Sequence, residues 1–405
     1  MKALPPAPWR EREGLVSLLD ALGAREGLTR IVGGAVRDTL LGLDVADIDC
    51  ATSLPPAEAR DRIVAAGFKA VPTGIAHGTV TAVIPGGPVE VTTLRRDVST
   101  DGRRATVAFT DDWREDAARR DFTINALSAD PITGEIYDYF GGTSDLEAGR
   151  VRFIGDPLVG IAEDHLRILR FFRFHARFGR GDPDRAGLAA CAQRANDLMA
   201  LSRERIADEL LKLLGAADPT PTVKLMLNHR ILKPVLPEID GTGAARLDGL
   251  VAREKRLGVA PDPLRRLAAL LPASEKIAED VGARLKLSKA AQRRLAIAAH
   301  PDPAPADPLP LAYRIGREGA IDRLLLRSPE SDAIADDFGK LADWKRPVLP
   351  LKGGDLIARG LRAGPVVAAT LQAIEQQWIE EGFPDPARVA AIADEKTAQA
   401  LRSGR

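Results

Sequence analysis

Two aspartates in the segment ADIDCAT (46–52) are the residues whose spacing indicates chemistry most directly. Asp47 and Asp49 are separated by one apolar residue in a short strand-like run, so strand alternation places both carboxylates on one face and Ile48 on the other. Neighbouring carboxylates repel each other, which raises their pKa values, and a bound cation removes this repulsion. Mg²⁺ fits, because it takes oxygen ligands and often shares substrate phosphates. A lone Asp-x-Asp is nevertheless more often a solvated turn.

A glycine pair, Gly33 and Gly34, follows the apolar run TRIV (29–32) and precedes the helix-like segment AVRDTLLG (35–42). Glycines at a strand-to-helix turn let a phosphate approach backbone N–H groups near the helix start. Arg37, one turn into this helix, adds a charge-assisted contact. The segment lacks the GxxxxGK[ST] pattern and is therefore not a P-loop. Without other evidence, the pair would be an ordinary turn.

GGAVRD followed by Asp-x-Asp resembles the nucleotidyltransferase superfamily, in particular the class II tRNA nucleotidyltransferases and the related bacterial poly(A) polymerases. The resemblance continues in order through VEVTTLRRD (89–97), ARRDFTINAL (118–127), YDYFGGTSDLEAGRVRFIGDP (137–157) and EDHLRILRFFRFHARFG (163–179). It implies that Gly33, Gly34 and Arg37 hold the triphosphate of a nucleotide. It also implies that Asp47 and Asp49 bind the metal ions, two Mg²⁺, that support nucleotidyl transfer.

Other polar residues in these segments have two interpretations each. Glu90 interrupts an apolar strand-like run. It is either a third carboxylate near the metal ions or an exposed strand residue. Arg119, Arg120 and Asp121 alone indicate a solvated helix end. The resemblance instead implies that they contact the phosphates and ribose of the incoming nucleotide.

An arginine-rich helix is predicted over residues 163–180. At 100° per residue, Arg167, Arg170, Arg173 and Arg177 share one third of its circumference, and Asp164 precedes Arg167 by about one turn. By itself the pattern favours a solvated face with ion pairs. The resemblance implies that Asp164 and Arg167 recognise the base, while Arg170 and Arg173 support it or the phosphates.

The pairing of an aspartate with an arginine suits two of the four bases. Cytosine and adenine each present an amino donor next to a ring-nitrogen acceptor, whereas uracil and guanine present a carbonyl in place of the amino group. A carboxylate only accepts and a guanidinium only donates, so together they match C and A. The protein itself would therefore act as the template.

The composition is that of an ordinary globular chain. Its 405 residues are too many for a single compact core, so more than one domain is expected. The charges of its 57 basic and 57 acidic residues cancel, so any nucleic acid must bind a local basic patch. Two distant cysteines, Cys50 and Cys191, indicate neither a disulfide framework nor a zinc site. The N-terminus lacks an apolar signal region, and no apolar run of membrane-spanning length occurs, which predicts a cytoplasmic protein without a membrane partner.

The order of elements predicts an α+β domain followed by an all-α part. The resemblance implies that the first is a polymerase-beta-like nucleotidyltransferase head with a mixed β-sheet and that the second forms a neck, body and tail. We expect a catalytic head over 1–145, a base-recognising neck over 146–215, a body over 216–300 and a tail over 301–405. A proline-rich stretch, Pro301 to Pro310, marks the last boundary. In the tail, glycines beside Lys352, Arg359 and Arg362 indicate a tRNA contact or a plain helical hairpin.

The resemblance predicts an enzyme that adds C, C and A to the 3′ end of tRNA from CTP and ATP, releasing pyrophosphate. The alternatives are a poly(A) polymerase of the same family, an A-adding tRNA nucleotidyltransferase and, more remotely, a non-catalytic RNA-binding protein. The tail-like GGDL segment (353–356) favours tRNA. The sequence leaves the oligomeric state open.

Overall fold

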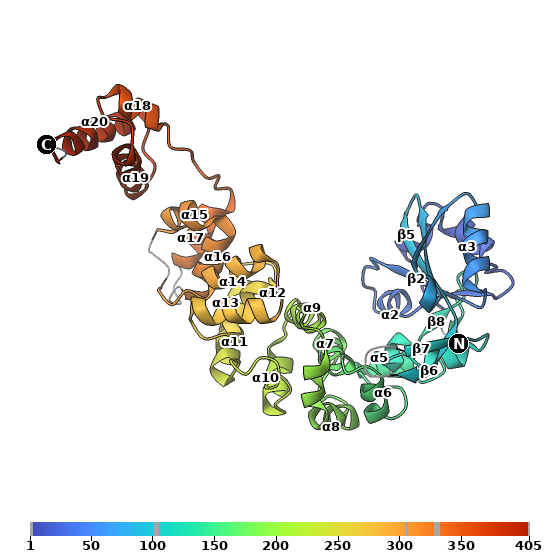
Figure 1. The fold of residues 1–405 in the computed structure, drawn as a ribbon. Coiled ribbons are helices and arrows are strands. Elements are labelled where there is room, and N and C mark those ends of the chain that lie inside the picture. The colour runs from blue at the N-terminus through green and yellow to red at the C-terminus, as the bar shows by residue number, and fades with distance from the viewer. Residues whose placement is uncertain (1–2, 101–104, 304–306, 328–332, 404–405) are drawn as a thin grey trace. The chain divides into compact units, whose positions relative to one another are not determined.

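The computed structural model describes residues 3–100, 105–303, 307–327 and 333–403. The chain forms two compact units, Met1–Ile239 and Asp240–Arg405. This division does not test the four segments expected from the sequence, which stay a prediction. Figure 1 colours the first unit from blue to green and the second from yellow to red.

Within the described residues, the first unit is built on a seven-stranded sheet with the order β3-β4-β5-β2-β1-β8-β9. The central pair β2 and β5 is parallel and the other neighbours are antiparallel, so the sheet is mixed as expected. The strands are β1 (Thr29–Val32), β2 (Ile48–Thr52), β3 (Lys69–Gly74), β4 (Thr79–Ile84), β5 (Gly87–Thr93), β8 (Ser128–Ala129) and β9 (Ile136–Tyr137). A separate two-stranded sheet joins β6 (Arg95–Thr100) to β7 (Ala105–Phe109).

Helices pack on this sheet, and further helices follow its last strand in the sequence. The α-helices of the first unit are α1 (Leu15–Ala21), α2 (Gly34–Leu40), α3 (Pro56–Ala65), α4 (Trp113–Ala118), α5 (Gly142–Ala148), α6 (Pro157–Glu163), α7 (Arg167–Phe178), α8 (Arg185–Gln193), α9 (Arg203–Leu214) and α10 (Thr220–Asn228). Short 3-10 helices are η1 (Pro8–Glu11), η2 (Ile75–His77), η3 (Thr123–Asn125) and η4 (Ala195–Ala200). Helix α3 contacts β3, β4 and β5, and α2 contacts β1 and β2 (Figure 1).

A cluster of phenylalanines anchors α7. Phe171 stacks on Phe153 with ring centroids 5.6 Å apart, and Phe174 meets Phe122 edge to face at 5.4 Å. Both α7 residues are buried, so the aromatic stripe of this helix lies in the core and its arginine face is left free to meet other elements. This packing places the start of α7 beside the segment 119–125.

The second unit is helical throughout its described residues. Its helices are α11 (Gly241–Arg256), α12 (Pro263–Leu270), α13 (Glu275–Arg284), α14 (Lys289–Ala298), α15 (Pro308–Ile315), α16 (Arg317–Arg327), α17 (Ala333–Ala342), α18 (Gly353–Ala358), α19 (Pro365–Glu380) and α20 (Pro386–Ser403). Buried charges tie four of them together: Arg265 bonds Glu254 at 2.6 Å and Asp322 at 2.9 Å, and Arg294 bonds Asp322 at 2.7 Å. Each buried charge thus has a partner, as burial requires.

The α+β fold class is confirmed, with local corrections. The helix predicted over 163–180 is α7, which begins at Arg167, because Asp164 is extended, at φ −147° and ψ 107°, between α6 and α7. The two alternating runs of GTVTAVIPGGPVEVTTL (78–94) predict a hairpin with a four-residue turn through Pro-Gly-Gly-Pro. The turn consists of Pro85 and Gly86 alone, because Gly87, at φ 115°, already pairs with Ile84. The segment EIYDYF (135–140) predicts a strand. The strand covers only Ile136–Tyr137, since Asp138 accepts backbone N–H groups of residues 140–143 and starts a turn. Of the proline-rich stretch, Pro305 lies outside the described residues.

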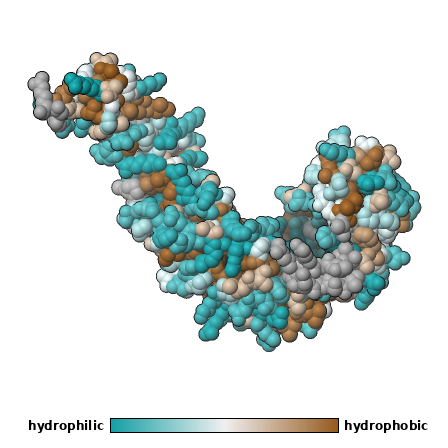
Figure 2. Space-filling view, viewed as in Figure 1, coloured by the Kyte–Doolittle hydropathy of each residue, from teal (hydrophilic) through white to brown (hydrophobic). Residues whose placement is uncertain are grey.

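The core is built mainly of aliphatic residues, with the buried charged residues described above among them. Figure 2 shows hydrophilic residues over most of the visible face of both units, with smaller hydrophobic groups among them. Cys50 and Cys191 are both buried free thiols. Among the described helices, none combines the length and hydropathy needed to cross a membrane.

Candidate active site

The carboxylates lie at the centre of the sheet. Asp49 on β2 is in register with Glu90 on the parallel neighbour β5, so the two side chains leave the same face side by side. Ile48 is buried at 1% exposure, whereas Asp47 is exposed just before the strand. Burial, then the charges of Glu90 and Asp47, raise the pKa of Asp49, against the opposing charge of Arg120. The negative charges of Glu90 and Asp47 therefore act on the carboxylate of Asp49.

These acids do not form a closed metal cage. Among the described residues, no group of three or more His, Cys, Asp and Glu side chains is close enough to hold a metal ion by itself. A repelling set of carboxylates that does not enclose an ion instead suits a cation that also takes water and phosphate oxygens, as Mg²⁺ does.

The glycine turn connects β1 to α2, as predicted. Gly33 has φ 63° and ψ −117°, a conformation that other residues avoid, and a Cβ there would come within 3.1 Å of an Arg120 guanidinium nitrogen. Its N–H donates to the Leu127 carbonyl at 2.9 Å, so this particular amide is already used inside the fold. A Cβ on Gly34 would meet only Arg37, at 3.7 Å. The fold thus requires Gly33, whereas at Gly34 the backbone is simply left uncovered.

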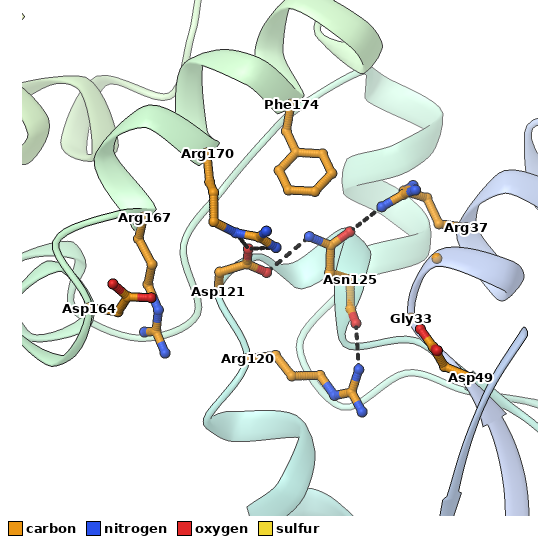
Figure 3. A pocket seen from close by; sticks show the side chains of 11 residues that line it. Gly33, Arg37, Asp49, Arg120, Asp121, Asn125, Asp164, Arg167, Arg170 and Phe174 are labelled. Atoms are coloured by element: carbon orange, nitrogen blue, oxygen red, sulfur yellow. Dashed lines mark hydrogen bonds and ion pairs between the residues drawn. The ribbon is translucent and has the colours of Figure 1, made fainter. Parts of the chain in front are cut away.

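A pocket of about 420 Å³ brings the predicted segments together (Figure 3). Four arginines and three aspartates line it, which makes a local basic site on a neutral chain. The lining residues are Gly33, Gly34, Arg37, Asp49, Arg120, Asp121, Asn125, Asp164, Arg167, Arg170 and Phe174.

A chain of hydrogen bonds crosses the pocket wall. Asn125 accepts from Arg37 at 2.5 Å through its side-chain oxygen and donates to Asp121 at 2.9 Å through its amide nitrogen (Figure 3). Asp121 in turn accepts from Arg170 at 2.6 Å. Burial acts to raise the pKa of Asp121, but the charge of Arg170 and these hydrogen bonds hold it below its ordinary value. One carboxylate thereby fixes Arg170 at the pocket.

The predicted base-recognising pair lies along the same pocket. Asp164, at the end of α6, accepts from the Leu166 N–H at 3.0 Å and from Arg205 of α9 at 2.8 Å. Arg167 donates to Glu163 at 2.8 Å and to the Arg119 carbonyl at 2.8 Å. Both side chains are held by neighbours. Each carboxylate oxygen of Asp164 can accept a further hydrogen bond, and the Arg167 guanidinium has five N–H groups, of which these two bonds use two.

Several predicted residues lie outside the pocket lining. Arg173 forms an ion pair with Glu209 of α9 at 2.7 Å, and Arg119 forms one with Asp116 at 2.8 Å. Asp47 and Glu90 flank Asp49 without lining the pocket. The roles predicted for these residues stay predictions.

Sequence reasoning missed Asn125 and Phe174 as pocket residues and Arg205 as the partner of Asp164. A signal existed for Asn125, because it is a lone amide in the otherwise apolar run FTINAL. A similar signal existed for Glu209, an acid on the apolar face of α9, where it is buried.

Comparison with known proteins agrees with this geometry. The model of the poly(A) polymerase head domain matches residues 29–152, and a model described as a probable RNA- and SrmB-binding site of polymerase A matches residues 183–241. The two matches contain the glycine turn, the carboxylates, the segment 119–125 and α9.

Similar proteins span most of the chain. The mitochondrial CCA tRNA nucleotidyltransferase 1 of Mus musculus is 34% identical over 388 residues, covering 92% of this chain and 87% of the mouse protein. The CCA-adding enzyme of Lacticaseibacillus paracasei is 32% identical over 374 residues, covering 87% and 88%. The crystal structure of the Bacillus stearothermophilus CCA-adding enzyme in complex with CTP superposes with a TM-score of 0.75 at 26% identity, covering 98% of this chain and 100% of that one.

Proposed function

Because the chain belongs to the family of CCA-adding tRNA nucleotidyltransferases, we propose that it adds C, C and A in turn to the 3′ end of tRNA from CTP and ATP. The observation that carries this proposal is the pocket of Figure 3, where glycine turn, carboxylate, arginines and the Asp164–Arg167 pair meet from four separate segments of the chain. A nucleoside triphosphate has a phosphate end, a sugar and a base, and the pocket offers groups suited to each.

In the proposed reaction, the 3′-hydroxyl of the RNA attacks the α-phosphorus of the nucleotide in line, and pyrophosphate leaves. Arg37 and Arg120 hold the phosphates beside the uncovered backbone at Gly34, while Asp121 accepts hydrogen bonds from the ribose hydroxyls. Positioning and charge compensation supply the catalysis, so no separate side-chain base is needed.

The cofactor in this proposal is Mg²⁺. Asp47, Asp49 and Glu90 fit it, because their mutual repulsion and the raised pKa of Asp49 are relieved by a cation. When bound, two ions would activate the attacking hydroxyl and stabilise the leaving group.

Base selection rests on Asp164 and Arg167. The carboxylate accepts from the exocyclic amino group of C or A, and the guanidinium donates to the adjacent ring nitrogen. U and G would leave lone pairs facing each other, and a site with such unpaired polar groups can reject a substrate by several powers of ten. Support comes from the bonds of Asp164 to Arg205 and of Arg167 to Glu163, which fix both orientations.

The alternative activities would use the same pocket, so the RNA that is extended distinguishes them. A poly(A) polymerase would use the same head, and an A-adding enzyme the same base site. Relatives named for CCA addition span 92% and 87% of the chain, which favours the complete reaction on tRNA. A cytoplasmic location stays a prediction, since the mouse relative is named as mitochondrial.

A gel assay with labelled CTP or ATP and Mg²⁺ separates these activities, using tRNA without CCA, tRNA ending in CC and an unstructured RNA. We expect addition of C to the first, of A to the second, and little to the third. Long A tails on any RNA would identify a poly(A) polymerase, and addition to the CC-ending tRNA alone an A-adding enzyme. No incorporation into any of them would contradict catalysis.

A further inference from the structure

The N-terminal strap, which we define as residues 3–14, packs on the first unit outside every motif discussed above. Leu4 donates its N–H to the Gly134 carbonyl at 2.7 Å, and the buried Trp9 donates from its indole nitrogen to Thr39 of α2 at 2.9 Å. These contacts fix the strap at two points.

Arg12 extends from this strap to the loop that carries a predicted metal ligand. Its Nη2 donates to the carbonyl oxygens of Val45 and Ala46, at 3.0 and 2.9 Å, and these residues directly precede Asp47. The loop 43–47 has no regular secondary structure, and Asp47 is exposed. A guanidinium that bonds two consecutive carbonyls therefore restrains the backbone from which Asp47 projects.

The same part of the strap also touches the hairpin that carries Glu90. The Gly86 N–H donates to the Glu13 carbonyl at 2.9 Å, and a Cβ on Gly86 would come within 2.8 Å of the Cβ of Arg12. Gly14 has φ 85°, and a Cβ there would come within 2.9 Å of Pro85. The backbone of the strap thus meets the turn between β4 and β5 at close range.

We propose that Arg12 is a positioning residue that sets Asp47 relative to Asp49 and Glu90. The inference rests on the proposed function, because it assumes that these carboxylates act together on a metal ion. Three like charges repel, and an exposed aspartate on an irregular loop would relax away from the other two. The two carbonyl bonds of Arg12 oppose that relaxation before any cation is bound.

The test compares four full-length proteins: wild type, Arg12→Met, Arg12→Lys and Arg10→Met. Arg10 is the matched control, because it lies on the same strap and donates to the carbonyls of Pro131 and Leu4, away from the carboxylates. Two quantities are measured: kcat and KM for CTP on tRNA without CCA, and Mn²⁺ affinity from the EPR signal of the free ion without nucleotide. Thermal unfolding midpoints report on folding.

We expect Arg12→Met to lower both kcat and Mn²⁺ affinity by about 10-fold, the usual effect of removing an outer partner of a metal site, with KM for CTP little changed. Arg12→Lys should recover part of both losses, and Arg10→Met should match wild type. The inference would be overturned if Arg12→Met and Arg10→Met had the same kcat and Mn²⁺ affinity. It would also be overturned if the losses in Arg12→Met were explained by a lower unfolding midpoint and were not recovered in Arg12→Lys. If wild-type protein incorporates no nucleotide, the proposed function fails, and Mn²⁺ affinity alone decides the role of Arg12.

Discussion

At the scale of single residues, the carboxylate of Asp49 is the group on which nucleotidyl transfer should depend most. Removing a metal ligand forfeits several kcal/mol of charge stabilisation, so Asp49→Ala should lower kcat by about 1,000-fold or more. Binding of tRNA should persist, because Asp49 is one half-buried side chain in the sheet. Single-turnover incorporation and a filter-binding assay measure the two effects. The control is Asp44→Ala, which removes an exposed aspartate in the preceding loop. Full activity in Asp49→Ala would rule out the role of this residue as a metal ligand.

The second residue prediction concerns base choice. Asp164→Ala removes the acceptor for the amino group, so discrimination between CTP and UTP should fall by about 100-fold or more. Competition assays with both nucleotides give the ratio. Asp208→Ala, which breaks an exposed pair with Lys212 on α9, should leave it unchanged. A retained preference for CTP in Asp164→Ala would exclude the template role.

Much of the site follows from residue types in order. The segments containing Gly33, Arg37, Asp121 and Asp164 are predicted together, and the structure brings them to one pocket. The bridging role of Asn125 is not predictable, because it depends on the distance between two side chains 88 and 4 residues away from it in sequence.

At the scale of elements, the Asp121–Arg170 pair joins α7 to the segment after α4. The pKa of Asp121 is held below 3.8, so the pair contributes its full stability above about pH 3.8 and loses it as the pH falls towards the lower folded value. Asp121→Asn should cost about 2 kcal/mol of unfolding free energy at pH 7, because it removes the charged hydrogen bond to Arg170 and leaves that guanidinium with the longer contact to Glu209, at 3.6 Å.

The measurement is urea unfolding of wild type and Asp121→Asn at pH 7 and at pH 3. The difference in unfolding free energy between them should shrink at pH 3, because this pH is below the ordinary aspartate pKa of 3.8 and the unfolded chain is protonated at Asp121 more readily than the folded protein. Asp208→Asn, at an exposed pair, serves as the control. A difference that is the same at both pH values would show that charge at Asp121 is not what stabilises this contact.

Helices are predicted better than strands, for a physical reason. The period of α7 and its arginine face are local properties of the sequence. The parallel pairing of β2 with β5 depends on residues about 40 positions apart, and no local pattern encodes it. The strap bearing Arg12 was likewise not anticipated, because its contacts are with backbone carbonyls that any residue type could provide.

At the scale of the whole molecule, the two units contain different predicted sites. The pocket lies entirely in the first unit, and the predicted RNA contact of the tail lies in the second. Gly353 is the first residue of α18, Gly360 follows that helix and Gly364 precedes α19. Arg359 is bonded to Asp394 at 2.8 Å, whereas Arg362 is exposed between α18 and α19. The boundary at residue 239 was not predicted, because the sequence is helical on both sides of it.

If the tail binds tRNA phosphates, Arg362→Ala should weaken tRNA binding and reduce the slope of log affinity against log salt by about 1, the value for one lost phosphate contact. The kcat at saturating tRNA should not change, since the pocket is in the other unit. Binding is measured by fluorescence anisotropy across a salt series. Lys276→Ala, an exposed lysine of the same unit, is the control, and an unchanged slope in Arg362→Ala would place the contact elsewhere.

The most direct test of the central claim is to sequence the product made from a tRNA transcript lacking its CCA end, incubated with all four nucleoside triphosphates and Mg²⁺. The pocket with its Asp164–Arg167 pair predicts addition of C, C and A, without U or G, followed by a stop. An extended A tail, frequent U or G, or an unaltered transcript would contradict the account.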